Sequence, residues 1–160
     1  MEPITPCIWL DGTADEAADF WVSVFPDGRR LDAATYAESG PGETGSTMTV
    51  EIELRGTKFL LLNGGPIFTL SPAVSFVIDC DDQDEVDYFW SRLLDGGEPS
   101  QCGWLTDRFG LSWQVVPRRL RELMTDPDPG RRERATAAML TMVKLDVAAL
   151  EAAADGAAPA

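Results

Sequence analysis

The stretch DEAADFW at residues 15–21 returns as DEVDYFW at residues 84–90, which is 69 positions further along the chain. The two stretches match at Asp, Glu, Phe and Trp, and each follows an apolar segment that predicts a β-strand. Each also precedes segments that are typical of hairpins. A pattern that restarts at a fixed offset indicates a duplicated supersecondary unit. We therefore expect two copies of one module, each built from a strand, a helix and further strands.

Around the first stretch, the hydrophobic periodicity predicts one helix and four strands. Strand 4–10 places Thr5, Cys7 and Trp9 on one face, opposite its aliphatic residues. In strand 46–54, Glu51 belongs to the more polar of two alternating faces. The other expected elements are a helix that begins at Thr13 with a capping box to Glu16, a strand at 31–37, an exposed loop at 38–45 and a strand at 58–64 that is apolar on both faces.

The second copy repeats this order and is followed by a different kind of sequence. A strand is expected at 73–79, a helix at 82–97, and short strands up to Pro117. Three helices are then expected at 118–124, 131–145 and 146–154, and Met139, Leu140, Met142 and Val143 would form an apolar stripe on the middle one. The expected domains are a first module at 1–66, a second module at 67–117 and a C-terminal helical extension at 118–160.

Composition excludes several classes of function. The formal net charge is −14, which disfavours nucleic acids and anionic membrane surfaces as partners. There is no histidine, so the usual general base near neutral pH and the commonest nitrogen ligand of transition metals are both missing. The three cysteines, Cys7, Cys80 and Cys102, are odd in number and lack metal-ligand spacing. No apolar run approaches the length of a membrane span, and no secretory signal is recognisable, so a cytoplasmic protein is expected.

Several segments resemble a known family. They are ITPCIWLDGTADEAADFW, LLLNGGP, QCGWLTDRFGLSWQVVP and the tail DPDPGRRERATAAMLTMVKLDVAALE. Together they are similar to the PhnB-like branch of the vicinal oxygen chelate superfamily (glyoxalase, bleomycin resistance and dioxygenase proteins), which is often labelled 3-demethylubiquinone-9 3-methyltransferase. The resemblance implies an α+β fold with two βαβββ modules that form a partly open mixed barrel, a ligand cleft on its concave side, and a homodimer.

The resemblance also implies where a metal would sit in the metal-dependent members of the superfamily. Carried onto this sequence, the four ligand positions fall at Thr5, Asn63, Ala73 and Gln114. A hydroxyl, two amides and a methyl group are poor ligands for a transition metal. We therefore expect neither a metal nor another cofactor. The methyltransferase label lacks a sequence counterpart too, because no glycine-rich strand-to-helix turn of the usual nucleotide-binding kind is present.

The expected ligand-binding residues are Thr5, Cys7, Trp9, Glu51, Asn63, Trp104 and Gln114. Each has a structural alternative: the amides of Asn63 and Gln114 could bond backbone instead of a ligand, and the two tryptophans could simply pack. Glu51 is the one candidate catalytic residue, as a carboxylate base if its strand face is concave and as an ordinary surface residue otherwise. The cysteines are more typical of packing than of nucleophiles, and Asp107-Arg108 are typical of a turn.

Three functions are compatible with these residues. The first is a metal-independent small-molecule-binding protein that acts as a homodimer. The second is an enzyme, either the methyltransferase of the family label or a metal-free isomerase or lyase with Glu51 as base. The third is an interaction protein whose C-terminal helices hold a partner.

Overall fold

The computed structural model describes residues 4–157 and divides into two compact units, with the boundary between Leu70 and Ser71. The first unit contains one helix and four strands, in the order that the sequence predicts. They are β1 (Cys7–Leu10), α1 (Ala14–Val24), β2 (Arg29–Thr35), β3 (Thr47–Leu54) and β4 (Thr57–Asn63). The sheet order is β1-β4-β3-β2, with β1 and β4 parallel and the other pairs antiparallel.

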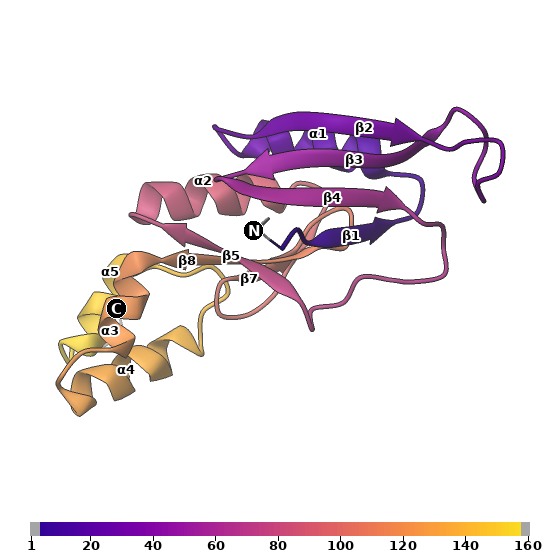
Figure 1. Cartoon of the computed structure of the whole chain (residues 1–160). Helices are drawn as coiled ribbons and strands as arrows, with labels where there is room; N and C mark the ends of the chain where they lie inside the picture. The colour runs from indigo at the N-terminus through magenta and orange to yellow at the C-terminus, as the bar shows by residue number, and fades with distance from the viewer. Residues whose placement is uncertain (1–3, 158–160) are drawn as a thin grey trace. The chain divides into compact units, whose positions relative to one another are not determined.

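The second unit repeats this arrangement and adds the C-terminal helices (Figure 1). Its elements are β5 (Ser75–Cys80), α2 (Gln83–Leu93), β6 (Glu98–Pro99), β7 (Trp104–Thr106), β8 (Ser112–Pro117), α3 (Arg118–Met124), α4 (Pro129–Met139) and α5 (Val147–Ala154). The sheet order β5-β8-β7-β6 is that of the first unit, again with one parallel pair. The predicted duplication and α+β class are therefore confirmed, and each module has an open, mixed, four-stranded sheet.

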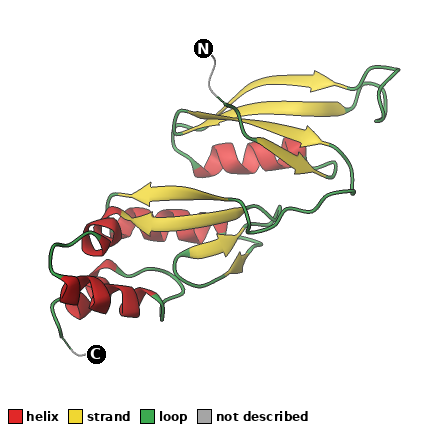
Figure 2. Cartoon of the chain, turned by 60° about the horizontal axis from the view of Figure 1, so that its bottom comes forward, coloured by secondary structure: helices red, strands yellow, loops and turns green. Residues whose placement is uncertain are grey.

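In each unit one face of the sheet is covered by the helix of that module (Figure 2). The alternation of buried and half-buried residues follows the period of two that the sequence shows. Trp21 of α1 and Phe89 of α2, both from the repeated stretches, are 1% exposed. Burial of such a side chain stabilises the fold by about 2–3 kcal/mol, so the repeated letters mark the core of each module.

Helix α1 begins differently from the expected capping box. Thr13 occupies the N-cap position, but its side chain makes no capping hydrogen bond. The backbone N–H of Ala14 instead donates to Oδ1 of Asn63 at 2.9 Å, from the end of β4. In α2 the cap is local, because Asp82 accepts from the N–H of Glu85. The capping box at Thr13 and Glu16 was wrong because a side chain 49 residues away supplies the acceptor.

The carboxylate of Asp107 organises the turn within the segment CGWLTDRFGLSW (102–113). Asp107 is 3% exposed and accepts hydrogen bonds from the N–H groups of Phe109 and Leu111 and from Nε1 of Trp113. It thereby closes the turn between β7 and β8 and fixes an aromatic side chain of the core. The turn role expected for Asp107 is the one that the structure shows.

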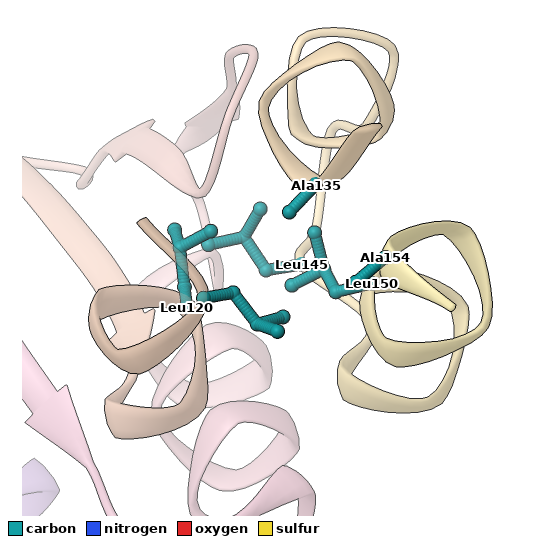
Figure 3. Packing of buried hydrophobic residues seen from close by; sticks show 6 residues of the cluster. Leu120, Ala135, Leu145, Leu150 and Ala154 are labelled. Atoms are coloured by element: carbon teal, nitrogen blue, oxygen red, sulfur yellow. The ribbon is translucent and has the colours of Figure 1, made fainter. Parts of the chain in front are cut away.

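The C-terminal helices pack on the second module. Leu120, Leu145 and Leu150 belong to a buried cluster between α3, α4 and α5 (Figure 3). The N–H groups of Cys102 and Gly103 donate to the carbonyls of Met142 and Val143 at 2.7 and 2.8 Å. Leu145 lies so close to Gly103 that an added Cβ there would be 2.8 Å from its Cδ1. The extension is thus part of the compact second unit.

The middle helix of the extension is shorter than expected. Helix α4 ends at Met139, and the chain then turns toward Cys102 and Gly103. Leu140 and Val143, expected on the apolar stripe of a longer helix, are 58% and 47% exposed. The long-range backbone hydrogen bonds made after Met139 replace the helical ones, which the helical periodicity of the segment could not reveal.

Candidate functional site

Several of the predicted residues gather on the face of the first sheet that is opposite α1, called here the first outer face. The register pairs Cys7 with Leu60 and Leu60 with Glu51, so these three side chains form a row across β1, β4 and β3. The next row is formed by Trp9, Leu62 and Thr49. Directly opposed residues of neighbouring strands have their side chains on the same face. Cys7, Trp9 and Glu51 therefore share a surface with two leucines.

Glu51 is the distinctive polar group of this surface. Glu51 is half-buried, and its side chain makes no hydrogen bond or ion pair with any residue in the described part of the chain. Glu53, two positions along β3, is instead paired with Arg29 at 2.8 Å. A half-buried carboxylate beside leucines loses hydration without gaining a partner, so it is poised to accept hydrogen bonds from another molecule.

Trp9 and Cys7 form the β1 side of the first outer face. The indole Nε1 of Trp9 donates to the carbonyl of Gly65 at 2.8 Å, and its ring meets Phe68 edge-on with centroids 5.0 Å apart. An added Cβ on Gly64 would lie 2.3 Å from this ring, so the glycine is required for the close approach. Partial burial raises the pKa of the Cys7 thiol, which argues against a thiolate nucleophile.

The second sheet has an equivalent outer face, opposite α2, that holds the other two predicted residues. Gln114 of β8 is paired with Trp104 of β7 on one side and with Val77 of β5 on the other. Its Nε2 donates to Oγ of Ser75 at 2.9 Å, whereas its Oε1 has no partner among the described residues. The half-buried Trp104 likewise has no described partner for its indole N–H. A free acceptor and a free donor thus lie side by side on this face.

Thr5 and Asn63 do not belong to the rows of the first outer face. Thr5 precedes β1 and is exposed. Asn63 points to the helix side of the first sheet, where Oδ1 accepts from Ala14 and Nδ2 donates to the carbonyl of Thr47 at 3.0 Å. Of the two roles considered for this amide, the structure shows the bonding to backbone.

Asn63 also lines a polar hollow of about 370 Å³ beside the N-terminus of α1, which the sequence did not reveal. Its walls are Asp11, Gly12, Asp15, Tyr36, Pro41, Gly42, Ser46, Thr47, Asn63, Gly64 and Gly65. The hydroxyl of Tyr36 donates to the carbonyl of Asn63, so the loop between β2 and β3 folds back over the end of β4. The sequence predicts an exposed loop at 38–45. It does not reveal the contact between Tyr36 and Asn63, because the two residues are 27 positions apart and leave no local pattern.

The polar groups around this hollow are largely satisfied within the first unit. A hydrogen bond from Thr47 and the Arg30 guanidinium at 2.5 Å hold the pKa of Asp15 below its usual value. Arg30 also pairs with Asp19 at 2.6 Å. The hollow is therefore lined by groups that already stabilise α1 and its sheet, and it is a weaker candidate site than the outer faces.

The donor sets do not fit a transition metal. Both functional atoms of the Asn63 amide are engaged by backbone, Gln114 donates to Ser75, Thr5 is exposed before β1, and Ala73 has no donor in its side chain. Within residues 4–157, no group of three or more His, Cys, Asp or Glu side chains is arranged to hold an ion. No helix in this described range is long and apolar enough to cross a membrane.

Two βαβββ modules with this strand order define a vicinal oxygen chelate fold. Residues 2–116 match the family described as 3-demethylubiquinone-9 3-methyltransferase. The chain belongs to this family, in the PhnB-like branch of the vicinal oxygen chelate superfamily. No curated protein matches the sequence.

Solved structures agree with this assignment. A putative 3-demethylubiquinone-9 3-methyltransferase, PhnB protein, from Bacillus cereus has 28% identity and a TM-score of 0.66 over 72% of this chain and 99% of its own. Protein PA1353 from Pseudomonas aeruginosa has 17% identity and a TM-score of 0.62 over 73% of this chain and 98% of its own. The fosfomycin resistance protein FosX from Listeria monocytogenes has 11% identity and a TM-score of 0.57 over 76% of this chain and 94% of its own. The last two show the fold alone.

Proposed function

We propose that this chain is a metal-independent small-molecule-binding protein that uses the outer faces of its two sheets and acts as a homodimer in the cytoplasm. The observation that carries the proposal is the set of unsatisfied polar groups on these faces: the Glu51 carboxylate, the Gln114 oxygen and the Trp104 indole N–H. None of these atoms is fully buried, so each is open to a hydrogen bond from outside the chain, and a few polar groups among apolar side chains are typical of ligand sites.

The chemistry of the faces narrows the class of ligand. Each face by itself offers a flat aromatic side chain beside an oxygen that can accept a hydrogen bond: Trp9 near Glu51 on the first face, and Trp104 near Gln114 on the second. The carboxylate of Glu51 and the overall charge of −14 disfavour anions. A neutral aromatic molecule that carries hydroxyl groups fits these properties, and catechol is a simple probe of that class.

Metal independence is tested by elemental analysis of purified protein without a polyhistidine tag. The tag must be absent because it would itself bind metal, whereas the native chain has no histidine. We expect far less than one transition-metal ion per chain, and unchanged thermal stability after treatment with a chelator. About one tightly held ion per chain would refute metal independence.

Ligand binding is tested by calorimetric titration with catechol. We expect saturable binding that weakens by about tenfold or more in Glu51→Gln or Gln114→Leu, since each removes a hydrogen-bond acceptor of roughly 1.5 kcal/mol. Glu53→Gln is the matched control, because this neighbouring carboxylate is already paired with Arg29. Absence of saturable binding, or equal effects of Glu51→Gln and Glu53→Gln, would contradict the proposed role of this face.

The partner-free Glu51 also supports a second candidate function, an isomerase or lyase in which this carboxylate takes a proton from a bound substrate. A base must reach the proton that it removes, and Glu51 has no protein partner to release first. The methyl transfer named in the family description is a separate reaction, and it requires a methyl donor. Calorimetry with S-adenosylmethionine tests it: saturable binding would favour the methyltransferase, and absence of binding would remove it.

A further inference from the structure

The C-terminal extension differs in charge from the rest of the chain. Residues 118–160 contain seven Lys or Arg and seven Asp or Glu, so the whole net charge of −14 lies in residues 1–117. Two copies of this protein repel each other through most of their surface, whereas their extensions can meet without net repulsion. The extension also lies beyond the family match, which ends at residue 116.

An apolar groove of about 660 Å³ runs along this neutral extension between α4 and α5. Alanines form most of its wall, including Ala137 and Ala138 of α4 and Ala152 and Ala153 of α5. No Asp or Glu lines the groove. Its one charged residue, Arg134, donates from Nε to the carbonyl of Ala154 at 2.9 Å and so satisfies the C-terminal end of α5. Side chains as small as alanine allow another element to approach the two helices closely.

The same segment presents large apolar side chains to solvent. Leu140 and Val143 flank the groove residues Thr141 and Met142 in the sequence, and they are 58% and 47% exposed. Their neighbours Met139 and Met142 pack against the buried cluster of the extension. The turn after α4 is therefore fixed from within while its two exposed residues remain uncovered.

We infer that the occupant of the α4–α5 groove is a second copy of this chain. A groove and two exposed apolar residues on one segment form a self-complementary surface, because Leu140 and Val143 of each copy can enter the alanine groove of the other. Such a reciprocal contact is the isologous arrangement of a twofold dimer. The inference rests on the proposed homodimer and adds the location of its interface.

Sedimentation velocity of the untagged full chain over a range of concentrations tests this interface. We expect Ala152→Glu to raise the dimer dissociation constant at least about 100-fold, because it places a long charged side chain in a close apolar contact, where that side chain must lose its hydration. Leu140→Ser should weaken the dimer about tenfold through loss of apolar contact. Ala148→Glu is the matched control: it adds the same charge to an exposed position of α5 that does not line the groove, and we expect a change of about threefold or less.

The outcomes separate the interface from the dimer itself. If the wild type stays monomeric, both the homodimer and the interface are refuted. If it dimerises and Ala152→Glu and Leu140→Ser dimerise equally well, the homodimer stands and the groove is not its interface. Equal disruption by Ala148→Glu would likewise overturn the assignment to the groove. Circular dichroism verifies that each variant is folded, and Ala137→Glu on α4 replaces Ala152→Glu if that variant unfolds.

Discussion

Substitution of Asp107 by Asn would show whether the turn of the family motif depends on a charged acceptor. The carboxylate accepts from two backbone N–H groups through Oδ1, at 2.9 Å from Phe109 and 3.0 Å from Leu111, and from Nε1 of Trp113 through Oδ2 at 2.8 Å. Asparagine has the same shape but replaces one oxygen by an NH2 group. If the amide oxygen keeps the two backbone bonds, its NH2 group must face the indole N–H.

The cost follows from these three hydrogen bonds. Bonds to a charged group contribute about 1.5–3 kcal/mol each and neutral ones about 1 kcal/mol, so weakening two bonds costs roughly 1–4 kcal/mol. The loss of the third bond, with two buried donors left facing each other, costs about 2 kcal/mol more. The opposite amide orientation loses two bonds and is worse. We expect Asp107→Asn to lower the free energy of unfolding by about 3–6 kcal/mol, a large part of the 5–15 kcal/mol typical of a domain.

Urea unfolding followed by far-UV circular dichroism measures this loss, and the NMR signal of the Trp113 indole N–H reports the bond directly. The matched control is Asp95→Asn, which removes the ion pair with Arg108 in a side chain that is 73% exposed. Exposed pairs contribute little, so a loss of about 0.5 kcal/mol is expected there. If Asp107→Asn costs less than about 1 kcal/mol, or no more than the control, the carboxylate does not hold the turn.

Three further predictions concern packing, capping and pH. Leu145→Ala should cost about 3 kcal/mol in urea unfolding, because Leu145 is fully buried, whereas Ile67→Ala at a 74% exposed position should cost about 0.5 kcal/mol or less. Asn63→Leu should cost about 2–3 kcal/mol, since it removes the acceptor that caps α1 and a second hydrogen bond, and a loss below 1 kcal/mol would contradict the capping role. Hydrogen bonding from Lys144 lowers the pKa of Asp87, so this contact stabilises the folded state above the unfolded pKa of about 3.9 and is lost as the pH falls through the lower folded pKa. Lys144→Met should therefore flatten the decline of stability with falling pH in acid, and an unchanged slope would rule this contribution out.

The duplication, the order of the elements along the chain and the inward faces were predictable because they follow from patterns within short stretches of sequence. In β3, for example, alternate residues from Val50 to Leu54 are buried and Glu51 is not, as a period of two requires. The repeated stretch gave the core side chains Trp21 and Phe89 directly. Each of these features can be recognised within short stretches of sequence, without knowledge of long-range contacts.

The features that the sequence did not reveal all depend on distant contacts. The cap of α1 comes from Asn63, and the early end of α4 depends on backbone bonds to Cys102 and Gly103. The polar hollow forms because Tyr36 reaches the end of β4. Polar side chains of this kind can find hydrogen-bond partners nearby in the sequence or far from it, and the sequence does not distinguish the two cases. The three-dimensional contacts were therefore needed to distinguish candidate site residues that bond within the protein from those whose side chains have no protein partner.

The segment CGWLTDRFGLSWQVVP (102–117) contains two sets of residues. One set packs in the core, and the other faces outward. Leu105, Trp113 and Val115 are buried in the core of the second module. Trp104 and Gln114, which alternate with them along the strands, lie on the second outer face. The inward residues are held by close packing, so a change of volume there disturbs the core. The outward residues carry a donor and an acceptor that have no partner among the described residues, and a change there alters the outer surface without a cavity in the core. A likeness based on this motif therefore establishes the architecture of the module and leaves its function to be decided by the outward residues.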